Sequence, residues 1–141
     1  MPIFVLDCSV TMAWCFEDEA CSYSDNVLMS LKNYKNRALV PSLWKLEVTN
    51  VLLMAERKKR ILEADMLHFI RFLKQLPLDI EKDNDSVSMG DLVLIGKTHQ
   101  LTAYDACYLH MAISLGLPLA TVDKRLEEAA KQAGVSIYHA G

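Results

Sequence analysis

The sequence predicts an α/β fold with a central parallel sheet. Short apolar runs of strand length recur along the chain, and Pro, Gly or Asp stands at one end of each. Longer segments with the length of helices lie between these runs. Because strands that are separated by helices pair in parallel, we expect the sheet to be built from β-α-β units.

Five apolar runs are expected to form the strands, at residues 3–6, 38–40, 78–80, 119–121 and 135–138. The residues that bound these runs are, in order, Asp7, Pro41, Pro77, Pro118 and Gly134. The intervening segments are expected to be helical, at residues 20–34, 42–60, 63–76, 84–100, 103–115 and 123–133. The helical pair from 42 to 76 is too long for one simple crossover, so we expect it to project as a helical hairpin.

Length and composition favour a single globular domain over residues 1–141. The chain has 141 residues, of which 52% are hydrophobic and 23% charged, which suits one ample core. It has no long apolar run, and its N-terminal MPIFVLDCSV lacks a basic region. We therefore expect a cytoplasmic protein without a membrane span or signal peptide. The net charge of −3 argues against a general nucleic-acid coat.

The four cysteines are expected to be reduced packing residues. They show no C-x-x-C spacing and lie in apolar or helical segments. These residues are Cys8, Cys15, Cys21 and Cys107. The pattern favours neither a disulfide framework nor a zinc site.

Three aspartates are expected at one edge of the sheet. Asp7 ends the first strand and Asp123 follows the fourth, and open parallel sheets bind ligands beyond the carboxyl ends of their strands. Asp105, in TAYDACYLHMAIS, opens the helix before the fourth strand and can reach the same edge. Each aspartate could instead cap a helix, and Thr102-x-x-Asp105 resembles a capping box.

Glu47 is a fourth acidic residue, and a helix cap cannot explain it. It lies mid-helix, roughly 200° around the helix from Lys45 on the expected solvent side. It therefore shares an apolar face with Leu43, Val51 and Met54. A lone Glu at such a position is often a snorkelling or paired residue.

Taken together, the four acids indicate a metal site. With no evident Lys or Arg among them, carboxylates that converge on one sheet edge would repel one another. Hard divalent cations are the usual way to neutralise such a cluster. A metal-free interaction module would leave Glu47 unexplained, while a phospho-accepting receiver domain would need an acidic pair after the first strand, which is missing.

The segments that carry these acids resemble PIN-domain ribonucleases, especially the VapC-type toxins of bacterial toxin–antitoxin pairs. They are FVLDCSV, PSLWKLEVTNVL, LTAYDACYLHMA and LATVDKRL, and the resemblance in order and spacing spans residues 4–138. It implies a three-layer α/β/α fold with about five parallel strands and a protruding helical hairpin. It also implies that Mg²⁺ or Mn²⁺ is held by Asp7, Glu47, Asp105 and Asp123, with Ser9 and Thr121 as supporting hydroxyls.

The resemblance further implies a metal-dependent endoribonuclease that acts as a toxin. Its partners would be an RNA substrate, a VapB-like antitoxin and a second copy of the chain. Two departures affect specificity more than chemistry: Cys8 stands where Thr or Ala is more usual, and His110 where a small residue is usual. A PIN-fold nuclease outside a toxin–antitoxin system and a non-catalytic interaction module are the alternatives.

Contacts to nucleic acid are less constrained by the sequence. The segment RKKR (57–60), together with Lys124 and Arg125, could hold phosphates, but cations also favour a helix C-terminus. Three aromatic residues could stack a base or belong to the core or a dimer contact. They are Trp14, Trp44 and Tyr104.

Overall fold

The structure, a computed structural model, describes residues 2–82 and 87–140. Its centre is a parallel sheet with the strand order β3-β2-β1-β4. The strands are β1 (Ile3–Leu6), β2 (Arg37–Pro41), β3 (Leu78–Glu81) and β4 (Leu119–Ala120). The predicted α/β class and parallel sheet are therefore confirmed.

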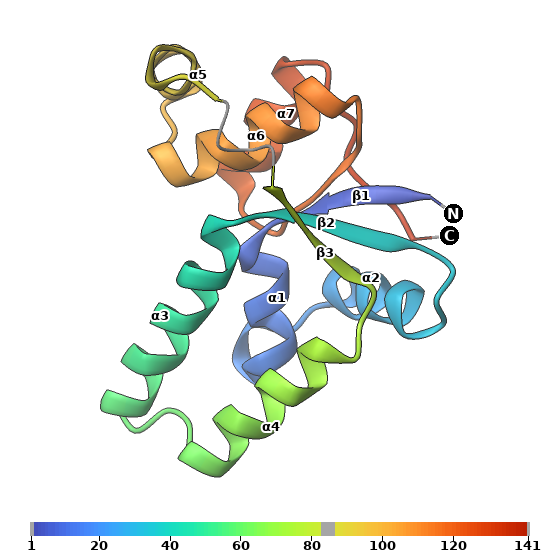
Figure 1. Cartoon of the computed structure of the whole chain (residues 1–141), viewed down its shortest axis with the longest axis vertical. Helices are drawn as coiled ribbons and strands as arrows, with labels where there is room; N and C mark the ends of the chain where they lie inside the picture. Colours follow the sequence, from blue (N-terminus) through green and yellow to red (C-terminus); the bar gives the residue numbers. More distant parts are fainter. Residues whose placement is uncertain (1, 83–86, 141) are drawn as a thin grey trace.

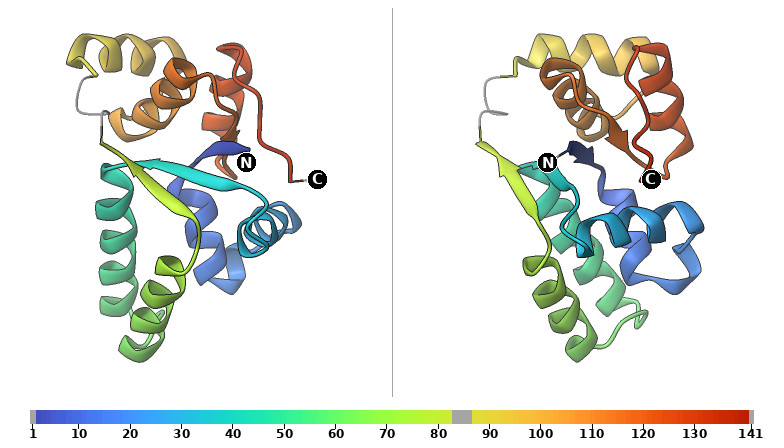
Figure 2. Two further views of the ribbon diagram at one scale, coloured as in Figure 1. Left: turned by 45° about the vertical axis from the view of Figure 1, so that its right-hand side comes forward. Right: turned by 90° about the vertical axis from the view of Figure 1, so that its right-hand side faces the viewer.

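Helices cover both faces of the sheet, which gives three layers (Figure 1). The first four helices lie on one face and the last three on the other, as Figure 2 also shows. They are α1 (Cys8–Cys15), α2 (Ser22–Lys32), α3 (Leu43–Arg57), α4 (Glu63–Lys74), α5 (Met89–His99), α6 (Ala103–Leu115) and α7 (Lys124–Gln132), with a short 3-10 helix, η1 (Glu17–Glu19), after α1.

Helices α3 and α4 form the predicted hairpin, which extends away from the sheet (Figure 2). The buried side of α3 presents Trp44, Val48, Leu52 and Ala55 to the core, a spacing of three and four residues that gives one stripe on a helix. The buried residues of α4 are Phe69 and Leu73. Packing of these apolar stripes holds the hairpin against the rest of the fold.

Helix α1, which begins two residues after the end of β1, was not predicted. Its sequence CSVTMAWC has almost no polar face, and five of its residues are buried: Cys8, Val10, Thr11, Met12 and Ala13. An amphipathic pattern cannot reveal a helix that is apolar nearly all round. A short run of this kind is as compatible with a strand as with a helix.

The expected fifth strand at 135–138 is reduced to a single bridge. Leu119 pairs with Ile137, and the Leu119 amide donates to the Ser136 carbonyl at 2.9 Å. The Tyr138 ring then stacks on Phe4 with a centroid separation of 3.8 Å. The segment therefore covers the core after one bridge instead of extending the ladder.

The start of one predicted helix differs from the structure. The helix expected at residues 84–100 begins at Met89, and residues 83–86 lie outside the described part of the chain. Within the residues that are described, no helix combines the length and apolar character needed to cross a bilayer.

The sheet register sets up the candidate site. Leu6 pairs with Ala120, and the Asp7 amide donates to the Ala120 carbonyl at 3.0 Å. The ends of β1 and β4 are therefore level, and α3 begins just after β2 ends. Side chains that follow these three strands gather at one edge, as parallel topology requires.

Candidate active site

Asp7 lies at the base of this edge, immediately after β1. Its carboxylate is 4% exposed, and Oδ2 accepts hydrogen bonds from Ser9 Oγ at 2.6 Å and Thr121 Oγ1 at 2.8 Å. Although Asp7 occupies the N-cap position of α1, its side chain makes no capping bond there. Its contacts therefore serve the sheet edge and not the helix terminus.

Burial raises the pKa of Asp7 from 3.8 to about 6. The hydrogen bonds from Ser9 and Thr121 oppose this rise, whereas the charges of Asp105 and Glu47 add to it. The three carboxylates are thus close enough to repel one another through the protein. A cation at this edge would relieve both the burial cost and the repulsion.

Asp123 caps α7. Its Oδ1 accepts hydrogen bonds from the backbone amides of Arg125 at 2.9 Å and Leu126 at 3.1 Å. The alternative prediction that this aspartate caps a helix is therefore confirmed for Asp123. Thr121 Oγ1 accepts from the Asp123 amide at 3.0 Å while donating to Asp7. This hydroxyl links the end of β4 directly to the buried Asp7.

Asp105 sits in the first turn of α6, but Thr102 is the residue that caps this helix. The Thr102 Oγ1 atom accepts from the Asp105 amide at 3.2 Å. Burial and the charge of Asp123 raise the pKa of the half-buried Asp105, and the Thr102 side chain and Arg125 oppose the rise. The charge of Asp105 also adds to the raised pKa values of Asp7 and Glu47. Asp105 therefore interacts electrostatically with each of the other three acids.

Glu47 projects from the middle of α3 toward α6. Its Oε1 accepts a hydrogen bond from the Tyr108 hydroxyl at 2.6 Å. Burial raises the pKa of Glu47, the Tyr108 hydrogen bond opposes this, and the charge of Asp105 adds to it. Glu47 therefore joins the other three acids at the same edge of the sheet.

The predicted face of α3 needs a correction. Glu47 lies beside the buried stripe and not within it, because its row continues through Met54, which is exposed. The most exposed apolar residue of α3 is Leu46, at 73%. Of the residues expected to share the apolar face with Glu47, Leu43 and Val51 are partly buried against the core. The error arose at Met54, an apolar residue that is exposed, because a hydrophobicity pattern assigns such a residue to the core.

Sequence reasoning missed Tyr108. The side chain is fully buried and its position reads as an ordinary core aromatic. Burial, together with the hydrogen bond to charged Glu47, raises the pKa of Tyr108 far above its usual range. The spacing from Asp105 could have identified Tyr108, because residues three positions apart lie on the same side of a helix.

The four acids offer carboxylate oxygens, the ligand type that Mg²⁺ and Mn²⁺ prefer. The ion pairs that join Arg37 with Asp79, Arg60 with Asp18 and Glu19, and Lys131 with Glu127 involve none of the four acids, and Arg125 is the cation whose charge acts on Asp105. In the described part of the chain, no three His, Cys, Asp or Glu side chains are grouped closely enough to hold a metal ion. The residues therefore suit a hard cation in type and charge, without enclosing it.

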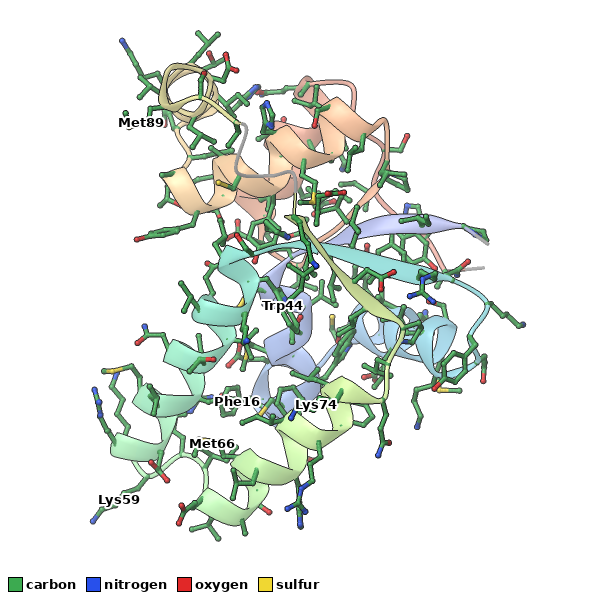
Figure 3. All side chains as sticks on the ribbon, in the orientation of Figure 1. Phe16, Trp44, Lys59, Met66, Lys74 and Met89 are labelled. Atoms are coloured by element: carbon green, nitrogen blue, oxygen red, sulfur yellow. The ribbon has the colours of Figure 1, made fainter. Side chains whose placement is uncertain are left out.

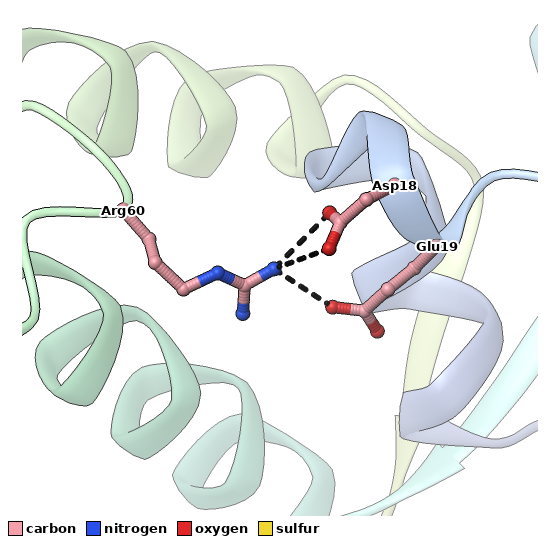
Figure 4. Close-up of polar contacts among 3 residues, drawn as sticks. All are labelled: Asp18, Glu19 and Arg60. Atoms are coloured by element: carbon pink, nitrogen blue, oxygen red, sulfur yellow. Dashed lines mark hydrogen bonds and ion pairs between the residues drawn. The ribbon is translucent and has the colours of Figure 1, made fainter.

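The basic segment 57–60 lies at the other end of α3. At 1.5 Å per residue, Arg57 is roughly 15 Å along the helix from Glu47, and Figure 3 shows Lys59 at the far tip of the hairpin. Arg60 Nη2 contacts Asp18 Oδ1 at 3.1 Å and Glu19 Oε2 at 3.4 Å (Figure 4). Its guanidinium also lies 4.2 Å from the Phe16 ring centroid. Arg60 thus fastens the hairpin to η1.

The three candidate stacking residues differ in exposure. Trp44 is buried and donates to Thr11 Oγ1 at 3.0 Å, and the partly buried Trp14 donates to the Ser24 carbonyl at 2.8 Å. Tyr104 is 61% exposed and precedes Asp105. Of the three, Tyr104 is therefore the one whose ring is available beside the acidic edge.

The four cysteines are free thiols. Cys8 and Cys107 are buried as expected, but Cys21 is exposed, which corrects the prediction that all four are packing residues. Hydrogen bonds from Ser24 lower the pKa of the Cys21 thiol. The half-buried His110 has an Nδ1 atom without a hydrogen-bond partner among the described residues.

Comparisons with known proteins agree with this architecture. The crystal structure of PAE2754 from Pyrobaculum aerophilum matches with a TM-score of 0.65 and 22% identity, over 91% of this chain and 86% of that one. A chain of VapBC2 from Rickettsia felis, crystallised with a DNA fragment from its promoter, matches with a TM-score of 0.65 and 15% identity, over 96% and 97%. No curated protein matches the sequence. The PIN domain family model matches residues 4–132, and the chain therefore belongs to the PIN domain family.

Proposed function

We propose that this protein is a Mg²⁺- or Mn²⁺-dependent endoribonuclease that acts as the toxin of a toxin–antitoxin pair. PIN domains are generally nucleases, which gives the reaction class. The observation that carries the proposal is the gathering of Asp7, Glu47, Asp105 and Asp123 at one sheet edge. There the charges of Asp105 and Glu47 add to the raised pKa of Asp7, that of Asp105 adds to the raised pKa of Glu47, and that of Asp123 adds to the raised pKa of Asp105. A fold that needed these positions only for stability would gain nothing from this repulsion.

The protein's own part in this chemistry is to hold oxygen atoms in place. Ser9 and Thr121 fix the Asp7 carboxylate through hydrogen bonds. Asp7, Asp105 and Asp123 would together hold the cation or its waters. Glu47 would serve as a further ligand or as the base that orients the attacking water. The bound ion would supply an activated water and stabilise the charge that develops on the phosphate. Mg²⁺ keeps several waters and needs only one or two carboxylates, so an enclosing cage is not required.

The proposed partners are RNA, a VapB-like antitoxin and a second copy of the chain. The similarity in fold to a chain of VapBC2 supports the antitoxin, which would lay a helix or strand over the acidic edge. The exposed apolar row of Leu46, Leu53 and Met54 on α3 supports a homodimer. Burying such residues against a second copy would be favourable.

The first test is RNA cleavage by the purified protein alone. We expect cleavage in Mg²⁺ or Mn²⁺ and none in excess chelator, because the four acids need a cation to bring a phosphate and a water together. Glu47→Gln, purified in parallel, should be inactive and so excludes a contaminating nuclease. Equal cleavage with and without chelator would contradict the metal mechanism and leave a non-catalytic interaction module as the better alternative.

The second test concerns the toxin role. Expression of the wild-type chain in a bacterium without the partner should arrest growth, whereas Glu47→Gln should be tolerated at the same level. A small antitoxin-like reading frame beside the gene is expected, and its coexpression should restore growth. If the wild-type chain is soluble, folded and tolerated, the toxin role is contradicted, and the cleavage test decides between a PIN-fold nuclease outside a toxin–antitoxin system and a non-catalytic interaction module.

A further inference from the structure

Tyr108 connects the hydrophobic core to the acidic site. Its ring is fully buried, and its hydroxyl donates to Glu47 Oε1 at 2.6 Å. The hydrogen bond joins α6 to α3, two helices on opposite faces of the sheet. Because Tyr108 follows Asp105 by three residues, one helix carries both an acid of the site and the donor that holds a second acid.

This hydrogen bond constrains an otherwise mobile side chain. A glutamate has three rotatable bonds, and fixing them costs conformational entropy each time a ligand requires one orientation. The donor is held in place, since the Tyr108 ring is fully buried and belongs to the hydrophobic core cluster. The Glu47 carboxylate is therefore oriented before any ligand arrives.

The chemical type of the donor matters as much as its position. A Lys or Arg could hold Glu47 equally well, but its positive charge would cancel the field that attracts a cation. A phenol hydroxyl donates a hydrogen bond without adding charge. Glu47 thus keeps its negative charge while the Tyr108 hydroxyl holds Oε1 by a hydrogen bond.

We propose that Tyr108 is a positioning residue that fixes the Glu47 carboxylate in the orientation needed to bind the divalent cation or its water. This inference rests on the proposed metal-dependent function, which it deepens. Tyr108 touches no substrate and acts only through Glu47. A tyrosine that merely filled the core would be replaceable by phenylalanine without effect on the site.

The test is Tyr108→Phe, with Tyr34→Phe as its control. The Tyr34 hydroxyl donates to the Gln75 carbonyl at 2.8 Å and contacts none of the four acids, so each variant loses a short hydrogen bond and keeps its ring. Calorimetric titration of the metal-free proteins with Mn²⁺ should show a dissociation constant raised roughly tenfold in Tyr108→Phe and unchanged in Tyr34→Phe. For RNA cleavage at fixed Mn²⁺, kcat should fall in Tyr108→Phe while KM for RNA stays the same.

Two further variants separate positioning from stability. In a Glu47→Gln background, adding Tyr108→Phe should change the Mn²⁺ affinity less than twofold, since the two changes act on one interaction. Glu47→Asp shortens the acid and withdraws it from the Tyr108 hydroxyl without touching the core, so adding Tyr108→Phe to Glu47→Asp should likewise leave the Mn²⁺ affinity unchanged. Thermal unfolding of each variant in chelator shows whether it is folded. An effect of Tyr108→Phe on Mn²⁺ affinity that persists at full size in either background would contradict the positioning role.

The outcomes distinguish this inference from the proposed function. If the wild-type protein binds Mn²⁺ and cleaves RNA, but Tyr108→Phe matches it in both, Tyr108 is a packing residue and the nuclease proposal stands. If the wild-type protein binds no Mn²⁺, the proposed function itself fails, and the positioning role fails with it.

Discussion

Asp105→Asn is expected to reduce RNA cleavage by roughly 100-fold or more while leaving the metal-free protein as stable as wild type or more stable. The loss follows because a bound cation contributes several kcal/mol to the transition state, and about 1.4 kcal/mol corresponds to tenfold in rate. The stability follows because the α6 cap is Thr102, which bonds the backbone amide of residue 105, and this amide is unchanged. Removing the charge also relieves repulsion with Asp7, Glu47 and Asp123.

Asp91→Asn is the matched control for this variant. In α5, the Ser88 Oγ accepts from the Asp91 amide at 3.1 Å, the same arrangement as Thr102 and Asp105 in α6. Asp91 is exposed and is not one of the four acids. Thermal unfolding in chelator and in Mn²⁺, alongside cleavage rates, should separate the two variants. A stable Asp105→Asn protein that cuts at a near wild-type rate would assign Asp105 only to the first turn of α6.

The placement of the acids could be predicted because it depends on topology. Asp7 directly follows an apolar strand, and the parallel pairing of Leu6 with Ala120 brings Asp7 into contact with Thr121, two residues before Asp123. The fold class depends on the same alternation of strands and helices, which the sequence displays directly. Glu47 could be singled out because a mid-helix acid beside apolar neighbours is unusual.

Other features depend on packing that periodicity does not encode. Helix α1 is apolar nearly all round, so its sequence lacks the polar stripe that marks a helix. The role of Tyr108 depends on a contact 61 residues away in the chain, and only the packing of α3 against its neighbours creates it. The Arg60 contacts with Asp18 and Glu19 are likewise long-range, so the segment 57–60 looked like a free basic cluster.

The metal-free protein is expected to lose stability as the pH rises from about 4 to above 6, and Asp7 should account for much of the loss. Its folded-state pKa is raised from 3.8 to about 6, chiefly by burial, so the folded state binds the proton more tightly than the unfolded state. The stabilisation is complete below the unfolded pKa and disappears as the pH passes the folded pKa. Since one pKa unit corresponds to about 1.36 kcal/mol, the Asp7 contribution is roughly 3 kcal/mol.

Asp7→Asn isolates this contribution from every other titrating group. The Asn side-chain oxygen can still accept the hydrogen bonds from Ser9 and Thr121, but it carries no charge, so the variant should lack this part of the pH dependence. Denaturant unfolding in chelator from pH 4 to pH 8 should therefore show the variant gaining on the wild type by about 3 kcal/mol across the range. Adding Mn²⁺ at pH 8 should restore the wild type and not the variant, because the ion stabilises only the folded state that binds it. Parallel curves for the two proteins would mean that burial of Asp7 carries no such cost, and the electrostatic case for a cation at this edge would lose its main support.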